Sequence, residues 1–348
     1  MNATFSPEQN ELSRIINDIT SDGVSQAKQC APDAWVEPSQ EQTLLENFGS
    51  LGIPEELGGI GGDLIDVVVA VEAAGQSVYP SRFIPQLAAL HLASTAGIDV
   101  SPVTQGGQKW SIATDETNSF GELLVAVKTG QGSVSGTKIL VPFASDATSF
   151  VVLGNDGVCL LSAHDISSSG TIDHSRPTGT VAFNSTPTQL GANTSGYLRA
   201  MVIAAAELCG VARGAVRLGA EFAKIREQFG QPIGARQGVA FQLSEAQVGV
   251  KAAWDLTVYA AWAAQSGHSD AHIIVAQAKE RAGRSAIFAA ERAIQVHGGM
   301  GITHEANPHL FLRRAMFNDT WLGSGIALRR QIGKWRMHNW ASSETLKH

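Results

Sequence analysis

The two stretches that are most informative about the fold lie in the C-terminal half of the sequence. They are Arg226-Glu227-Gln228-Phe229-Gly230-Gln231-Pro232-Ile233-Gly234 and Gln295-Val296-His297-Gly298-Gly299-Met300-Gly301. In the first, a glycine and a proline follow an aromatic residue, which predicts a tight turn between two helices. An arginine at the start of such a turn can make bidentate, charge-assisted bonds to a pyrophosphate. In the second, the paired glycines allow a backbone to approach another molecule closely. The two stretches together therefore predict a binding surface.

Helical periodicity surrounds both stretches. Apolar residues recur at intervals of three or four from residue 243 to residue 256, which gives one apolar stripe. The pattern predicts four long helices over residues 201–225, 238–265, 272–295 and 324–340, and Glu305 is expected to begin a short helix. Abundant alanine and glycine permit close approach, so we expect an antiparallel four-helix bundle within residues 191–348.

The rest of the chain shows two further sequence patterns, one helical and one typical of β-strands. Residues 1–105 read as a helical domain, with Ser6 as the expected cap of a helix over 7–19 and further helices over 39–48, 64–75 and 82–96. The glycine-rich segment 54–62 is expected to be a turn, because no strand precedes it. Residues 106–190 instead alternate β-branched runs with turn residues, which predicts an antiparallel β-sandwich or barrel. The expected strands cover residues 123–127, 139–141, 150–153, 158–161 and 180–183.

Composition limits the function. The formal net charge of −7 argues against nucleic acid or an anionic membrane as the main partner. Cys30, Cys159 and Cys209 lie far apart and are odd in number, which favours a reducing cytoplasm over a disulfide framework. The histidines are scattered, so no metal site is expected. No apolar run of about 18 residues and no signal-peptide pattern occurs, which predicts a soluble cytoplasmic protein.

The motifs and their order resemble the acyl-CoA dehydrogenase family over nearly the whole chain. Besides the two C-terminal stretches, the segment 53–59 resembles a Pro-Glu-x-x-Gly-Gly loop of that family. Residues 134–138 and 171–177 resemble its mid-domain turn and the segment that closes its β domain. The resemblance implies an α+β fold with an N-terminal helical domain, a central antiparallel β domain and a C-terminal four-helix bundle.

The resemblance also implies a cofactor, FAD, and roles for particular residues. Arg226, Phe229, Gln295, Gly298 and Gly299 match groups that in the family reach the flavin of a neighbouring subunit. The structural alternative is that the arginine only complements a helix C-terminus and the glycines only end a helix.

The catalytic glutamate of the family is missing from both of its usual places. Leu322 occupies the position in the Glu-Gly-Thr pattern, and Leu198 occupies the alternative position before an arginine. Proton abstraction next to a thioester needs a positioned base, and leucine cannot ionise. Segment 112–120 is also shortened relative to the family's loop that holds flavin and thioester. Glu207, on an apolar helix, remains an outside candidate for a base.

These features favour a subunit that completes a partner's site. The resemblance implies an α2β2 assembly with a glutamate-bearing acyl-CoA dehydrogenase subunit. That assembly would desaturate an acyl-CoA substrate, with a steroid side chain suggested by the subunit type, and pass electrons to an electron-transfer flavoprotein. Two alternatives stay open: a homomeric dehydrogenase with a relocated base, and a flavin-free scaffold. Leu198 and Leu322 argue against the first alternative, and Arg226, Phe229 and Gln295 argue against the second.

Overall fold

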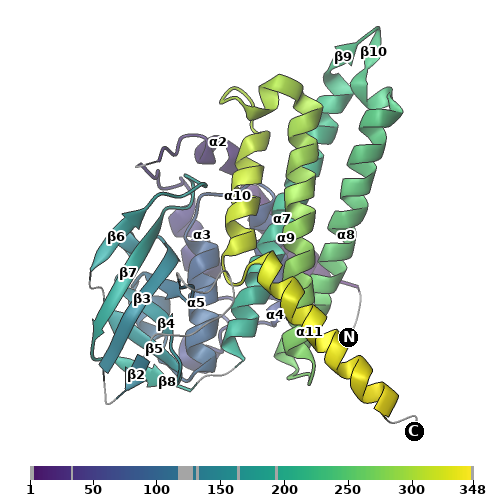
Figure 1. Cartoon of the computed structure of the whole chain (residues 1–348). Helices are drawn as coiled ribbons and strands as arrows, with labels where there is room; N and C mark the ends of the chain where they lie inside the picture. Colours follow the sequence, from purple (N-terminus) through teal and green to yellow (C-terminus); the bar gives the residue numbers. More distant parts are fainter. Residues whose placement is uncertain are drawn as a thin grey trace.

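The computed structural model describes residues 4–32, 34–116, 128–130, 133–162, 165–192 and 195–345. Figure 1 shows a β domain on one side of the molecule and long C-terminal helices on the other. The N-terminal helices α4 and α5 lie between them, because both contact α7 and α5 also contacts strands β1, β4 and β5. The fold is α+β, as the sequence predicts.

The N-terminal helices follow the expected pattern closely. Helix α1 begins after Ser6, whose side chain accepts a hydrogen bond from the Gln9 backbone in a capping box, and Pro7 occupies the first helical position. Helix α4 is apolar along most of its length and almost wholly buried. The short helix α2 was not expected. The bounds are α1 Pro7–Ile19, α2 Gly23–Ala27, α3 Glu41–Phe48, η1 Glu55–Leu57, α4 Leu64–Gly75, α5 Phe83–Thr95 and α6 Ser101–Thr104.

The β domain consists of two four-stranded sheets, with orders β1-β4-β5-β8 and β2-β3-β7-β6. Most pairs are antiparallel, but β1 pairs with β4 in parallel, which corrects the all-antiparallel expectation. The long connection from β1 through β2 and β3 to β4 permits this arrangement. The strands are β1 Trp110–Ala113, β2 Lys128–Gly130, β3 Ser133–Pro142, β4 Ser149–Leu153, β5 Val158–Ser162, β6 Ile166–Ser169, β7 Thr178–Ser185 and β8 Gln189–Gly191, with η2 Ala144–Asp146 between β3 and β4.

The C-terminal half is helical, and its small residues let the helices approach closely. A Cβ atom added at Gly210 of α7 would lie 2.1 Å from the Glu72 carbonyl oxygen of α4, so the two backbones touch there. Helices α7, α8, α9 and α10 pack together as a bundle. The bounds are α7 Gly196–Ile225, β9 Glu227–Gln228, β10 Gln231–Pro232, η3 Ile233–Ala235, α8 Gln237–Gln265, α9 Ala271–His297, η4 Gly298–Ile302, α10 Pro308–Thr320 and α11 Gly325–Thr345.

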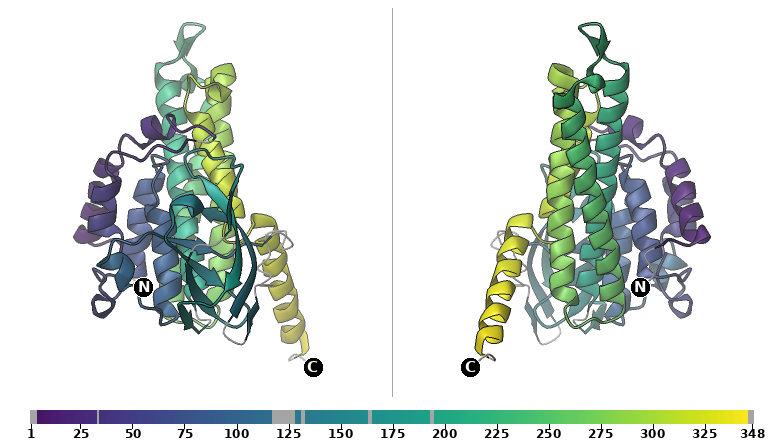
Figure 2. Two further views of the ribbon diagram at one scale, coloured as in Figure 1. Left: turned by 90° about the vertical axis from the view of Figure 1, so that its left-hand side faces the viewer. Right: turned by 90° about the vertical axis from the view of Figure 1, so that its right-hand side faces the viewer.

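One bundle helix differs from the expectation. Helix α10 was not predicted, and it takes the fourth place in the bundle, whereas α11 packs on α9 and then extends past the body of the protein (Figure 2). The apolar stripe of α10 is not evident in the sequence, because the buried face of this helix also carries Arg314 and Asn318. Glu305 begins no helix: it lies in a turn after η4, and α10 begins only at Pro308.

Two expectations concern other parts of the chain. The predicted strand over residues 123–127 lies outside the described residues. The domain boundaries near residues 105 and 190 stay predictions, and one apolar core runs through the N-terminal helices and the bundle alike. A second, smaller core lies between the two sheets. Among the described helices, none combines the length and apolar character needed to cross a membrane.

Candidate functional site

The first stretch forms a hairpin that projects from the end of the bundle, between α7 and α8 (Figure 1). Strands β9 and β10 pair through Gln228 and Gln231, and the turn between them contains Phe229 and Gly230. Both turn residues have positive φ, 55° and 78°, as the two-residue hairpin turn that matches strand twist requires. The Phe229 ring is 90% exposed, and the Arg236 guanidinium lies 5.0 Å from its centroid. The hairpin therefore presents an aromatic face to the outside.

Arg226 lies at the base of this hairpin and is exposed. Its backbone is fixed: the amide donates to the Phe222 carbonyl at 2.9 Å, and the carbonyl accepts from the Ile233 amide at 2.8 Å. Its guanidinium makes no ion pair or hydrogen bond with any residue that the structure describes. A positioned backbone with an uncommitted cation is suited to holding an anionic group from outside the chain.

The second stretch ends α9 at the same end of the bundle. Gly298 has φ 64°, and a Cβ atom placed on Gly298 or Gly299 would meet nothing within 4 Å. Gln295 is exposed in the last turn of α9. The glycines therefore leave an open strip of backbone that a ligand or another chain can approach.

A ring contact joins the two stretches. The Phe222 ring stacks on the His297 imidazole, with centroids 4.1 Å apart and planes inclined by 20°. The His297 ring is oriented by a 2.7 Å hydrogen bond between Nδ1 and the Ala293 carbonyl. Because Phe222 lies one turn before Arg226 and His297 directly precedes Gly298, the predicted cofactor residues are grouped at one end of α7 and α9.

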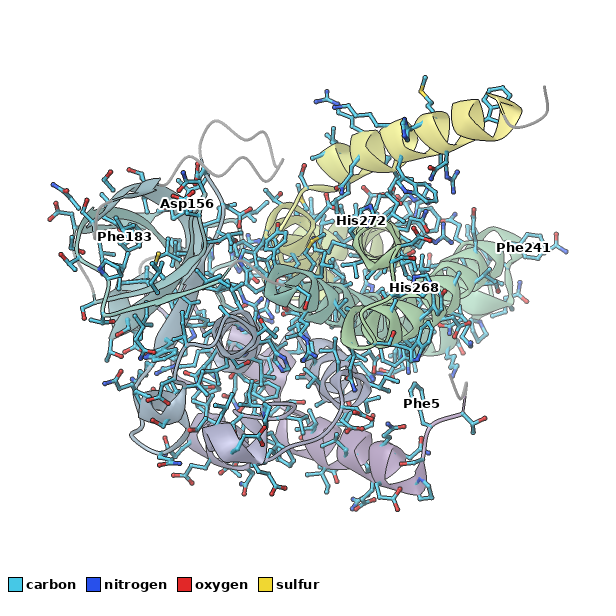
Figure 3. The ribbon with its side chains drawn as sticks, turned by 90° about the horizontal axis from the view of Figure 1, so that it is seen from below. Phe5, Asp156, Phe183, Phe241, His268 and His272 are labelled. Atoms are coloured by element: carbon cyan, nitrogen blue, oxygen red, sulfur yellow. The ribbon has the colours of Figure 1, made fainter. Side chains whose placement is uncertain are left out.

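Apolar side chains extend this end into a larger exposed surface. Figure 3 shows Phe241 pointing away from the bundle on the outer side of α8. Exposed apolar side chains are typical of surfaces that bind another protein where they form a contiguous patch. The surface comprises Ile225 at 77%, Phe229 at 90%, Phe241 at 64%, Val248 at 69%, Met300 at 48% and Ile302 at 73% exposure.

Position 322, where the family resemblance predicts a glutamate, is closed. Leu322 is fully buried and has φ 59°, a left-handed conformation that is unfavourable for a residue with a side chain. Its amide donates to Asp115 Oδ2 at 3.3 Å. Burial raises the pKa of Asp115, against the opposing hydrogen bonds from Thr114 and Leu322. Leu198, at the alternative base position, is half-buried and packs against the core.

Lys279 holds the same turn from the other side. Its Nζ donates to the carbonyls of Asn318 at 2.6 Å and Gly323 at 3.4 Å, and the side chain is buried in α9. Burial lowers its pKa to about 8. The sequence provides no sign of Lys279 and indicates Asp115 only as part of segment 112–120, because both residues contact the turn across long sequence separations.

Glu207, the outside candidate for a base, is a structural acid. Its Oε2 and Oε1 each accept from the Arg176 guanidinium at 2.7 Å, and Oε1 also accepts from Arg314 at 2.9 Å. Although burial alone would raise the pKa of Glu207, these two arginines lower it. A fully buried carboxylate that is held by two cations is a poor proton acceptor.

Two further expectations concern segment 112–120 and metal binding. Segment 112–120 is described only as far as Glu116, which accepts a hydrogen bond from the buried Lys138 at 2.5 Å. Within the described ranges, no group of three or more His, Cys, Asp or Glu side chains is placed to hold a metal ion.

Comparison with known proteins identifies relatives over most of the chain. The sequence model of the family described as "Acyl-CoA dehydrogenase, C-terminal domain" matches residues 195–337. "Acyl-CoA dehydrogenase IpdE2" of Mycobacterium tuberculosis is 30% identical over 299 residues, which cover 82% of either chain. "Acyl-CoA dehydrogenase FadE34" of the same organism is 32% identical over 86% of this chain and 42% of its own length.

Solved structures agree on the fold. The ChsE4-ChsE5 complex from Mycobacterium tuberculosis contains a chain that superposes with a TM-score of 0.83 at 24% identity, over 96% of this chain and 98% of its own. A chain of a "Tcur3481-Tcur3483 steroid ACAD" variant gives a TM-score of 0.83 at 25% identity, over 96% and 99%. Both structures contain two different named components.

Proposed function

Because the chain belongs to the acyl-CoA dehydrogenase family of flavin-dependent oxidoreductases, we propose that it is the non-catalytic subunit of a heteromeric acyl-CoA dehydrogenase. In this proposal it completes the FAD site of a glutamate-bearing partner subunit, in an α2β2 assembly. The assembly desaturates an acyl-CoA thioester between its α and β carbons. The observation that carries the proposal is the contrast between a closed base position and an open outward surface.

The absence of an ionisable side chain at the expected base positions supports the proposal. A general base needs an ionisable group within hydrogen-bond reach of the α-proton. Leu322 and Leu198 provide none, and Glu207 is occupied by Arg176 and Arg314. The turn at Leu322 is also tied down by Asp115, so none of the three positions 198, 207 and 322 offers a free base to a substrate thioester.

The exposed groups at the end of the bundle also support the proposal. Arg226 offers an uncommitted guanidinium, and Gly298 with Gly299 offers backbone without side chains in the way. These groups suit an anionic, elongated cofactor such as FAD, whose pyrophosphate the arginine would hold. The exposed Phe229 face and the apolar side chains around it would exclude water once the partner covers them.

The chemistry is divided between the two subunits. The flavin, when bound, supplies the hydride acceptor, and the partner's glutamate removes the α-proton. The residues of this chain bind and orient: Arg226 fixes the pyrophosphate, Gln295 donates to or accepts from the cofactor, and the glycines set the distance of approach. A steroid side-chain thioester is the proposed substrate class, because the structure described as a steroid ACAD is among the similar structures. Electrons would leave through an electron-transfer flavoprotein.

The test is co-expression. The chain alone is expected to be colourless, and co-expression with a glutamate-bearing relative encoded nearby is expected to give a yellow complex with FAD in a fixed ratio. The measurement is the flavin absorbance of the purified proteins, with the partner expressed alone as the control. One FAD per chain in this protein purified by itself would favour a homomeric dehydrogenase, and a complex without flavin would favour a scaffold. Either result rejects the proposal.

A further inference from the structure

A cleft of about 330 Å³ lies beside α3, α5 and the residues that follow α6. Figure 1 shows α3 and α5 well separated from the β9–β10 hairpin, so the cleft is distinct from the cofactor residues at the end of the bundle. Its wall contains acidic side chains, amide side chains and two apolar side chains. The acidic ones are Glu37, Glu41 and Glu46, and the apolar ones are Leu45 and Val103. This composition and this volume suit a small polar molecule.

Gln86 of α5 lines this cleft with an unsatisfied amide. The residue is only 6% exposed, and its side-chain amide forms no hydrogen bond with any residue that the structure describes. An amide that is removed from water to this extent is normally hydrogen-bonded. Because Gln86 belongs to the wall of the cleft, a molecule in the cleft can supply the partner. The Gln86 side chain is therefore evidence for a polar ligand.

The two cations of the wall are already neutralised. The Arg82 guanidinium forms ion pairs with the carboxylates of Glu37 at 3.2 Å, Glu41 at 3.0 Å and Asp146 at 2.6 Å. The Lys109 ammonium shares the last of these carboxylates, at 3.1 Å. Three acidic groups therefore surround two basic ones, and little positive charge remains to attract an anion.

Two acidic side chains of the wall lack full compensation. Glu46 is exposed and forms no ion pair with a described residue, and its carboxylate accepts a hydrogen bond from the Gln42 amide at 2.5 Å. Glu41 is 2% exposed, and burial raises the pKa of its carboxyl, against the hydrogen bonds from Ser81 and from the Arg82 amide. A cation that entered the cleft would stabilise both carboxylates in their charged form.

We propose that this cleft binds an organic diamine. One ammonium group, which has three N–H donors, would donate to the Gln86 amide oxygen and to the Glu41 carboxylate. The second would lie near Glu46, and the methylene chain between them would contact Leu45 and Val103. A metal ion suits the cleft less well, because within the described ranges no three acidic, cysteine or histidine side chains are placed to hold one. The proposal does not rest on the proposed function, because the cleft shares no residue with the cofactor surface.

The test uses calorimetric titration of the full chain at low salt with putrescine, its monoamine analogue butylamine and the neutral 1,4-butanediol. Putrescine is expected to bind most tightly, because only putrescine carries two ammonium groups. Gln86→Leu keeps the size of the side chain but removes the amide, and should weaken putrescine binding about tenfold. Glu46→Gln removes an exposed charge and should weaken it about threefold. Glu56→Gln, an exposed change in η1 outside the cleft, is the matched control and should change nothing.

Three results would overturn the proposal: no saturable binding of putrescine at millimolar concentration, butylamine or 1,4-butanediol binding as tightly as putrescine, or unchanged putrescine affinity in both Gln86→Leu and Glu46→Gln. Urea unfolding of Gln86→Leu checks that the fold is kept, and we expect a midpoint no lower than that of the wild type, because the amide has no partner in the described protein to lose. If Gln86→Leu does not fold, Glu46→Gln alone decides the last result. A failure of co-expression to give a yellow complex leaves these measurements unaffected, so the two proposals fail separately.

Discussion

Arg226→Gln is the sharpest test of the cross-subunit cofactor site. The side chain is exposed and makes no described contact, so its loss should change the free energy of unfolding of the chain by less than about 0.5 kcal/mol. In the complex, however, the guanidinium would hold the flavin pyrophosphate. A hydrogen bond to a charged group contributes about 1.5 to 3 kcal/mol, which corresponds to a loss of FAD affinity of roughly 10- to 150-fold.

The assay is a fluorescence titration of the flavin-stripped complex with FAD, together with size-exclusion chromatography to show that the subunits stay associated. Arg226→Lys keeps the charge but loses the planar fork, and we expect it to fall between the wild type and Arg226→Gln. Arg330→Gln on α11 controls for general charge effects. Because the interaction is electrostatic, the difference between wild type and Arg226→Gln should shrink at high salt. Equal FAD affinity in wild type and Arg226→Gln would refute the assigned role.

Four further changes test other parts of the argument. Gly299→Leu should leave the stability of the chain nearly unchanged, since a Cβ there meets nothing within 4 Å, but should reduce FAD retention in the complex. Glu207→Gln should lower the free energy of unfolding in urea by about 3 to 5 kcal/mol, because the buried Arg176 loses its counter-ion and the buried Arg314 keeps only Asp173. The pKa of Lys279 in the folded protein is about 8, below its ordinary value, so the folded protein releases this proton at a lower pH than the unfolded chain does. Between about pH 8 and the ordinary pKa of lysine, the free energy of unfolding therefore rises with pH. Lys279→Met should remove this part of the rise in stability, as measured by urea unfolding at several pH values. Leu322→Glu should create no turnover in the chain alone and should lower its melting temperature, because it buries a carboxylate beside Asp115; new activity would contradict the idea that the site is closed.

The fold was predictable where apolar spacing is regular. Helices α7, α8 and α9 have long stripes of small and apolar residues, and their observed bounds differ from the expected ones by a few residues. Helix α10 escaped prediction because Arg314 and Asn318 lie on its buried face. Their burial depends on Asp173, Glu207 and Arg176, which come from distant parts of the chain. No local sequence pattern predicts such an arrangement of buried polar contacts.

The candidate site was predictable only as separate pieces. Each motif could be recognised from its own residues, but their common location depends on the stacking of Phe222 on His297, which closes a gap of 75 positions in the sequence. The contact between Asp115 and Leu322 spans 207 positions and could not be inferred from either segment. The cofactor roles of these residues therefore stay predictions, and the structure shows which of the predicted residues lie together.

The turn at Leu322 is held in place although its backbone conformation is unfavourable for leucine. A buried leucine in the left-handed region costs about 1 to 2 kcal/mol relative to an ordinary conformation, and nothing in a leucine side chain requires it. The conformation is nevertheless held on both sides, by Asp115 on the Leu322 amide and by Lys279 on the Gly323 carbonyl. A turn that had no further use could relax by substituting glycine or by changing its path. Its retention is explained if the turn still sets where α11 begins, because α11 starts two residues after Gly323 and carries the chain away from the bundle (Figure 2). The backbone of the turn therefore serves the arrangement of the helices, and this role does not depend on which side chain stands at position 322.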